Sequence, residues 1–329
     1  MTVDMVENLA PIGERRLPVP QNSELEPDLG RPRVLGGLAI GIIDNVLAHW
    51  YLLPGLPFQR YRLRLLISNL IRRTTAGATP ALALYQTPNP TAYLEFEFAR
   101  RALMSLRNLG AYLDVSSPWL FPLALLSRQP ADRALLMGAA PEELDHLVKA
   151  ARLEAPGGIV CSATSATSVE PESYDTVTSL SWIARAENDM SALKMLWSAL
   201  RPGGTLLISL PCGGAGAEES TSANPKVEQR IPARRVYDAV LLKERIFDLV
   251  GQPKRGVIYG PASRASRAPR SDDCDDEIHR DWRASMRLGR EWRCYSSLRE
   301  LPGKGVIAMK FVKLDQSVSA STSFSSWLV

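Results

Sequence analysis

Histidine and cysteine are scarce in this 329-residue sequence, and they are widely spaced. There are three histidines and four cysteines, and no two cysteines form a CxxC pair. We therefore expect neither a zinc site nor a disulfide framework. The formal net charge is only +4 and the arginines are scattered, so we do not expect a nucleic-acid partner.

The sequence also lacks a clean apolar run long enough to cross a bilayer. Residues 34–56 come close, but Asp44, Asn45 and His49 interrupt them, and charged groups near a helix centre are costly in lipid. We predict that 34–73 is helical and packs against the main domain. Because 60–73 alternates arginines with aliphatic residues, peripheral contact with a membrane surface is the less favoured alternative.

Acidic residues, rather than an apolar segment, follow the first methionine, so we expect no secretory signal and a cytoplasmic location. Residues 1–33 contain five prolines and no apolar period, which predicts a flexible tail. We then expect a helical extension and linker at 34–94, the main domain at 95–315 and a C-terminal tail at 316–329. Within the main domain, 260–281 is a polar insertion. Its clustered aspartates lack a regular ligand spacing, so a solvated loop is favoured over a cation site.

The middle of the chain reads as strand, helix, glycine turn and strand. Residues 174–180 are rich in β-branched types, and the apolar residues of 193–200 fall at helical spacing. The run 201–204 breaks the helix, and 205–210 is almost wholly apolar, as in parallel strands that are covered on both faces. This pattern predicts one βαβ unit of an α/β sheet. We also expect strands at 112–115, 256–260 and 305–313, and a helix at 93–106.

Two motifs in this region carry a resemblance. The sequence Ser-Tyr-Asp-Thr-Val-Thr-Ser at 173–179, followed by Leu-Arg-Pro-Gly-Gly-Thr-Leu at 200–206, resembles the central third of class I S-adenosylmethionine-dependent methyltransferases. There, an SFDxVxS strand precedes a helix that ends in LKPGGxL. The run Leu-Asp-Val-Ser-Ser at 113–117 takes the place of the first strand and glycine turn of that family, VLDVGCG. The resemblance covers roughly residues 95–312.

This resemblance implies a Rossmann-like fold and a cofactor. The expected fold is a seven-stranded, mostly parallel sheet with helices on both faces, and the expected cofactor is S-adenosylmethionine. The corresponding cofactor-binding positions are Asp114, Ser116, Ser117, Gly138, Ala163, Thr164 and Ser179.

Several of these positions depart from the pattern of the family. Serines stand where the turn should be glycine, and Pro118 removes a backbone donor. Met137 or Gly138 replaces the acid that accepts from the ribose, and Ala163 replaces the acid near the adenine. Losing two such acids would weaken cofactor binding by about 3–6 kcal/mol, so we expect S-adenosylmethionine to bind weakly or to have been lost.

Tyr237 and Asp238 are the best candidates for contacting an acceptor substrate. The alternative is that Asp238 caps a helix beside a packed Tyr237. Arg185 replaces the usual histidine of the fourth segment, and it could bind an anionic substrate group or lie on a surface helix.

Two functions follow from these observations. The first is methyl transfer to a small-molecule acceptor, such as a sugar or a natural product. The second is a catalytically silent methyltransferase-fold partner or regulatory subunit, in a homo-oligomer or in a hetero-oligomer with an active methyltransferase. A repurposed fold that binds another ligand is a third alternative.

Overall fold

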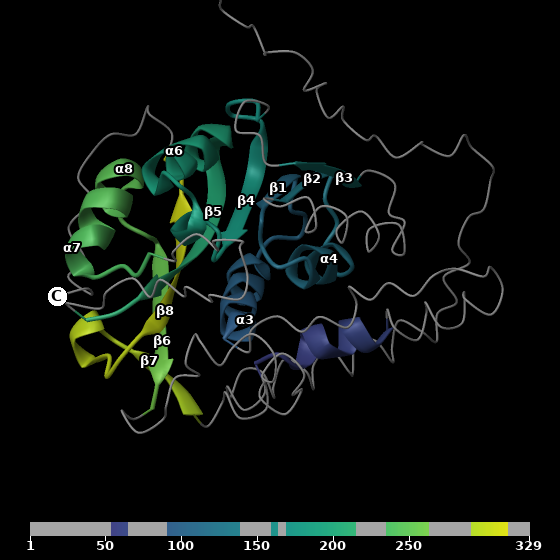
Figure 1. Cartoon of the computed structure of the whole chain (residues 1–329). Helices are drawn as coiled ribbons and strands as arrows, with labels where there is room; N and C mark the ends of the chain where they lie inside the picture. The colour runs from purple at the N-terminus through teal and green to yellow at the C-terminus, as the bar shows by residue number, and fades with distance from the viewer. Residues whose placement is uncertain are drawn as a thin grey trace, which may run out of the picture.

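The structure is a computed structural model that describes residues 54–64, 91–138, 159–163, 169–214, 235–262 and 291–314. Its centre is a single eight-stranded sheet with the order β3-β2-β1-β4-β5-β8-β6-β7 (Figure 1). The strands are β1 Ala111–Val115, β2 Arg133–Gly138, β3 Ile159–Ala163, β4 Tyr174–Leu180, β5 Leu200–Cys212, β6 Arg255–Pro261, β7 Trp292–Tyr295 and β8 Gly305–Val312.

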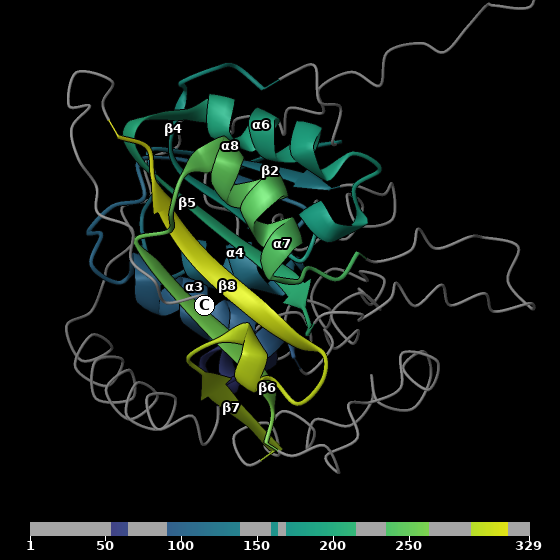
Figure 2. The same ribbon diagram turned by 90° about the vertical axis from the view of Figure 1, so that its left-hand side faces the viewer.

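The first five strands are parallel, and the last strand of the chain runs against its neighbours. β1 pairs in parallel with both β2 and β4, whereas β8 lies antiparallel between β5 and β6 (Figure 2). All of the strands expected from the apolar runs are present, so the predicted Rossmann-like sheet is confirmed. The short strand β7 adds an eighth member at the edge by pairing with β6.

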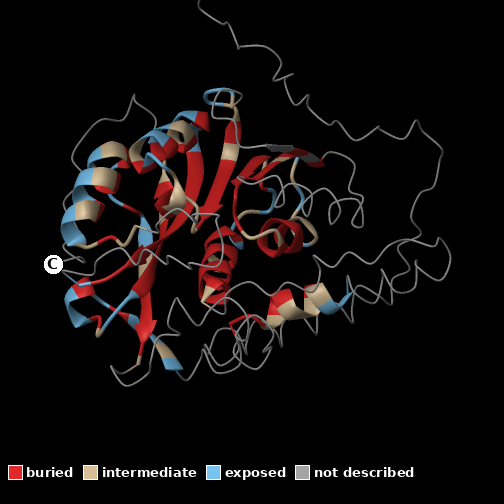
Figure 3. Cartoon of the chain, viewed as in Figure 1, coloured by how far each residue is buried: buried red, intermediate tan, exposed pale blue. Residues whose placement is uncertain are grey.

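Helices cover both faces of the sheet. They are helix 56–64, α3 Ala92–Leu103, α4 Leu120–Leu126, α6 Asp189–Ala199, α7 Ala239–Leu242 and α8 Asp248–Val250, with a π-helical turn between the last two at Lys243–Phe247. Successive strand residues enter different cores, since Tyr112 packs with α3 and α4 while Leu113 packs with α6 and α7. The central strands are consequently largely buried (Figure 3), which explains the almost wholly apolar sequence of residues 205–210.

The predicted helix breaker at 201–204 forms a bulge inside β5. Gly203 has φ +79°, and its N–H donates to the carbonyl of Lys313 at 2.6 Å. The carbonyl of Gly204 in turn accepts from Lys313 N at 3.0 Å. The Pro-Gly-Gly turn therefore holds the end of the last strand as well as ending α6.

The N-terminal extension packs on the domain where it is described. Residues 56–64 are helical, and Phe58 and Tyr61 are buried in the core that α3 and α4 share. The Phe58 ring centroid lies 5.1 Å from that of Phe96 and 6.2 Å from that of Phe121. In the described ranges, no helix is long and apolar enough to span a membrane. The tails at 1–33 and 316–329, the aspartates of 272–276 and the rest of 34–73 lie outside those ranges.

A glycine at the start of β1 provides a test of local packing. Gly110 has φ +66°, and a Cβ atom there would lie 2.5 Å from Oδ2 of Asp175, which accepts a hydrogen bond from Ala111 N at 2.8 Å. We expect Gly110→Ala to lower the free energy of unfolding by about 2 kcal/mol, because left-handed strain alone costs about 1 kcal/mol and Asp175 must move. Urea denaturation measures this difference.

The control is Gly203→Ala. This position has a similar φ, +79°, but no atom lies within 4 Å of a Cβ placed there. Its loss of stability should therefore report the backbone strain alone. Equal losses in the two variants would show that the Asp175 contact contributes nothing.

Candidate functional site

The candidate site lies where the order of the parallel strands reverses, at the carboxyl ends of β1 and β4. Ligands of open α/β sheets bind at such switch points. Two non-glycine residues there have left-handed backbones, Ser116 after β1 with φ 52° and Ser181 after β4 with φ 61°. The two turns are joined, because Ser117 Oγ accepts from Leu180 N at 3.0 Å. Strained residues of this kind gather at functional sites.

Asp114 is buried beneath the first turn and shapes it. Its Oδ1 accepts from the backbone N–H of Ser117 at 3.2 Å, and its Oδ2 accepts from the hydroxyls of Thr178 at 2.5 Å and Tyr112 at 3.3 Å. Burial raises the pKa of Asp114 to about 6, although the hydrogen bonds from Thr178 and Ser117 oppose the shift. Both carboxylate oxygens therefore face groups of the protein.

The serines predicted to bind the cofactor also bond within the protein. Ser116 Oγ donates to the carbonyl of Met137 at 3.5 Å, and Ser179 Oγ donates to the carbonyl of Val115 at 3.0 Å. Ser116 keeps the left-handed backbone expected of the first glycine of the turn, but it adds a side chain there. The backbone conformation of the glycine turn is thus preserved at Ser116, but its side chain occupies space that a glycine would leave open.

The two positions expected to carry acids meet at the ends of neighbouring strands. Gly138 ends β2 and pairs with Ala163, which ends β3. Neither residue type can accept a hydrogen bond through its side chain. Thr164, the weaker substitute, lies outside the described residues.

The structure brings to the site one acid that was missed in the sequence. Glu95, from the first turn of α3, is 2% exposed and accepts from Ser181 Oγ at 2.6 Å and from Ser209 Oγ. It thereby ties α3 to the ends of β4 and β5. The available signal was an acid flanked by the apolar residues Leu94 and Phe96, since buried acids usually need partners.

Two of the three predicted substrate residues have structural contacts instead. Tyr237 is fully buried, and its hydroxyl donates to Asp189 at 2.7 Å. Asp238 caps α7, because its side chain accepts from the backbone N–H groups of Val240 and Leu241. This is the capping alternative considered above, and we place both residues outside the candidate site.

Asp189 is the centre of a buried ionic cluster at the start of α6. It forms salt bridges with Arg235 at 3.0 Å and Arg245 at 2.7 Å. Burial alone would raise its pKa. The hydrogen bond from Tyr237 and the charges of the two arginines outweigh burial, and the pKa of Asp189 is lowered.

Arg185 is the predicted substrate residue that the structure brings to the site. It lies in the 3₁₀ turn Ile183–Arg185 that follows β4, and its Nε donates to the carbonyl of Ser181 at 3.3 Å. Its guanidinium group therefore places a positive charge beside the strained turn. Within the described ranges, no three His, Cys, Asp or Glu side chains gather as a metal site.

Comparison with known proteins gives only distant structural likenesses. No protein-family model matches the chain, and no curated protein does. Among solved structures, it is similar to geranyl diphosphate methyltransferase in complex with S-adenosylmethionine, with 9% identity, a TM-score of 0.48 and coverage of 67% of this chain and 85% of the other.

Two further solved structures show the same level of likeness. The YcgJ protein from Bacillus subtilis has 8% identity and a TM-score of 0.46, over 68% of this chain and 99% of that one. Phosphoethanolamine N-methyltransferase 2 from Haemonchus contortus has 15% identity and a TM-score of 0.45, over 66% and 53%. Likenesses this low do not decide function, and the fold assignment rests on the strand order and the two helical layers. By that architecture, the chain has the Rossmann-like fold of class I methyltransferases.

Proposed function

We propose that this chain is a catalytically silent methyltransferase-fold protein, which serves as a partner or regulatory subunit of an active methyltransferase. The observation that carries the proposal is that the polar side chains at the switch point form hydrogen bonds within the protein. Asp114, Ser117 and Ser179 all direct their side-chain hydrogen bonds to the protein itself. A cofactor would have to displace these bonds to use the same groups.

The side chains missing from the ends of β2 and β3 support the same proposal. S-adenosylmethionine carries a sulfonium and an ammonium group against one carboxylate, so it is a net cation. Gly138 and Ala163 supply no negative side chain where the family has acids. Arg185 adds a positive charge at the end of β4. This charge does not establish a net repulsion, because the acids Asp114 and Glu95 lie at the same site. The missing acceptors at Gly138 and Ala163 therefore carry the argument.

Calorimetric titration of the purified chain with S-adenosylmethionine and S-adenosylhomocysteine tests the proposal. We expect no binding below about 1 mM, because the loss of two charged hydrogen-bond acceptors weakens binding by about a hundredfold or more. The double variant Gly138→Asp, Ala163→Asp should regain measurable affinity for both ligands. A low-micromolar dissociation constant for the unaltered chain would overturn the silent-partner proposal.

The position of Arg185 favours a second candidate function. If the chain does transfer methyl groups, its small-molecule acceptor should carry an anionic group, which Arg185 would bind beside the switch point. In that case, Arg185→Gln should raise KM for the acceptor while cofactor affinity stays unchanged. An equal loss of affinity for cofactor and acceptor would contradict this role.

A further inference from the structure

Three cationic side chains gather where β6 begins and β8 nears its end. Arg255, the first residue of β6, pairs directly opposite Lys310 of β8, and Lys254 comes just before it. Lys254 and Arg255 are exposed, and Lys310 is partly buried; we call these three residues the basic patch. Because β8 is antiparallel to both β5 and β6, the patch lies at the opposite end of the sheet from the switch point.

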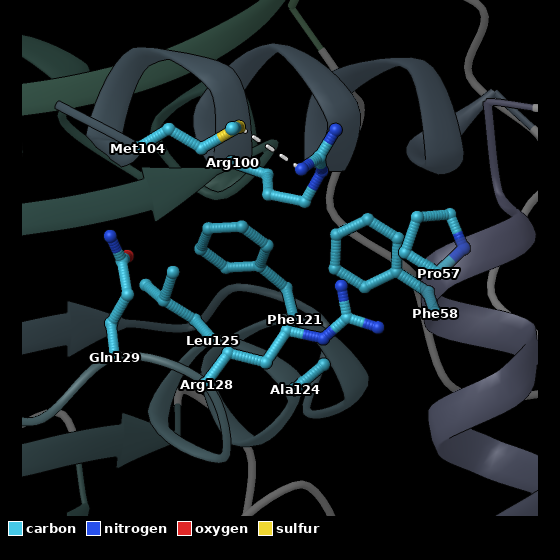
Figure 4. Close-up of a pocket in the computed structure, with 9 residues that line it drawn as sticks. All are labelled: Pro57, Phe58, Arg100, Met104, Phe121, Ala124, Leu125, Arg128 and Gln129. Atoms are coloured by element: carbon cyan, nitrogen blue, oxygen red, sulfur yellow. Dashed lines mark hydrogen bonds between the residues drawn. The ribbon is translucent and has the colours of Figure 1, made fainter. Parts of the chain in front are cut away.

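The patch lies on the face of the sheet that α3 covers. Cζ of Arg255 is 5.9 Å from the centroid of the Phe98 ring, and Nζ of Lys310 donates to the carbonyl of Ala102 at 3.0 Å. Another side of α3 faces elsewhere, since Arg100 lines a separate cavity between α3, α4 and helix 56–64 (Figure 4). The basic patch is therefore distinct from that cavity.

The positive charges of the patch are not balanced by an acid. In the part of the chain that the structure describes, no ion pair includes Lys254, Arg255 or Lys310, whose side chains contact only a ring and a carbonyl. Burial lowers the pKa of Lys310, and the charges of Arg255 and Lys254 lower it further. Like charges directly opposite each other in a sheet are destabilising, so an anion bound here would relieve an existing repulsion.

The patch borders an open edge of the sheet. β7 pairs with β6 only from Ile258 to Pro261, and among the described strands residues 255–257 pair with β8 alone. Such an edge can accept an added strand from another chain. Cations beside the edge repel a basic strand and attract an acidic one, so charge would select what is added.

We propose that residues 254–257 and Lys310 form a docking site for an acidic, extended segment of a partner protein. The segment would add to the outer edge of β6 and set its carboxylates against the basic patch. This inference rests on the proposed role as a partner subunit. Its test is separate, because the patch and the switch point lie at opposite ends of the sheet, and cofactor titration can fail without affecting peptide binding.

The test uses a fluorescein-labelled peptide of about eight alternating Glu and Thr residues, longer than a typical strand. Its glutamates all lie on one face when it is extended. Fluorescence anisotropy should show saturable binding to the full chain in about 0.05 M salt. Binding should weaken severalfold in about 0.5 M salt, because salt screens exposed charge pairs.

Two control peptides separate charge from strand pairing. A Lys-Thr peptide of the same length should not bind. A Glu-Thr peptide that is N-methylated at both central residues keeps its charge but loses backbone donors, and it should bind at least about fivefold more weakly, the equivalent of one hydrogen bond.

Charge-reversal variants connect the binding to the patch. The double variant Lys254→Glu, Arg255→Glu should weaken the Glu-Thr peptide by at least about tenfold. The matched control, Lys194→Glu with Lys243→Glu, makes the same change of net charge at exposed positions of the other helical layer and should keep most of the affinity. Urea denaturation should show no loss of stability in the patch variant, because Glu at position 255 would face Lys310. If that variant does not fold, Lys254→Gln with Arg255→Gln replaces it.

Several results would overturn the proposal. They are no saturable binding of the Glu-Thr peptide in low salt, equal affinity for the Lys-Thr peptide, and equal losses in the two double variants. Undiminished binding of the N-methylated peptide would exclude strand addition. Self-association of the chain that the patch variant abolishes would place a second copy, rather than an acidic partner segment, on this edge.

Discussion

Replacing Asp189 with alanine is expected to lower the free energy of unfolding by about 2–4 kcal/mol. The change leaves the buried hydroxyl of Tyr237 without its acceptor and separates Arg235 and Arg245 from their shared carboxylate. The two arginine side chains are 24% and 35% exposed, so they regain some hydration, and the loss should fall below that of a fully buried pair. Urea denaturation at neutral pH measures the effect.

The pH dependence gives a second measurement on the same variant. Because the pKa of Asp189 is lowered in the folded state, its stabilisation is present above the ordinary aspartate pKa and is lost as pH falls through the folded value. Asp189→Ala should therefore lose less stability on acidification than the unaltered chain. The control is Asp248→Ala, which breaks an exposed pair with Lys243 and should cost no more than about 0.5 kcal/mol. Comparable losses in both variants would contradict the importance of the cluster.

Asp114→Asn is expected to have the opposite effect and to stabilise the protein by about 1–3 kcal/mol at pH 7.5. At that pH the unaltered Asp114 is ionised in a fully buried position, with a pKa of about 6. Asparagine removes the buried charge. Its oxygen can still accept from Ser117 N, and its NH₂ group can donate to the hydroxyl of Thr178 or Tyr112.

The stability of the two proteins should differ in a defined pH window. Below about pH 4, Asp114 is protonated in both the folded and the unfolded state. The stabilisation of the folded state by this bound proton is then fully present. As pH rises toward 6, the unfolded state releases its proton first, and the unaltered chain loses that stability. Asp114→Asn should lack this decline, as measured by urea denaturation at several pH values. Parallel curves for the two proteins would show that burial does not raise this pKa.

The main elements of the fold could be predicted from the sequence because their signals are local. Parallel strands that are covered on both faces are typically rich in apolar residues, so the run 205–210 predicted a strand. The Pro-Gly-Gly turn predicted the end of α6, because proline and glycine interrupt helices. The edge strand β7 was not predicted, because Trp292–Tyr295 is short and carries a polar residue in the middle.

The site was harder to predict because its contacts join distant segments. Glu95 and Ser209 are separated by 114 positions, and Asp189 meets Arg245 across 56. The residues next to Tyr237 in the sequence do not indicate that its hydroxyl will donate a hydrogen bond to Asp189. The resemblance already predicted the loss of the usual acids at Gly138 and Ala163. The hydrogen bonds that Asp114 and the serines form within the protein became evident only in the structure.

The place of β8 has a consequence for the order in which this protein can assemble during synthesis. β6 joins the body of the sheet through β8, and β8 is among the last described segments to be made. Until residues 305–312 leave the ribosome, β5 has an open edge and the β6–β7 pair has no strand to dock on. Such late, long-range pairing slows folding and exposes apolar edges. The half of the sheet that carries the switch point can therefore form first, with completion of the sheet following translation of β8.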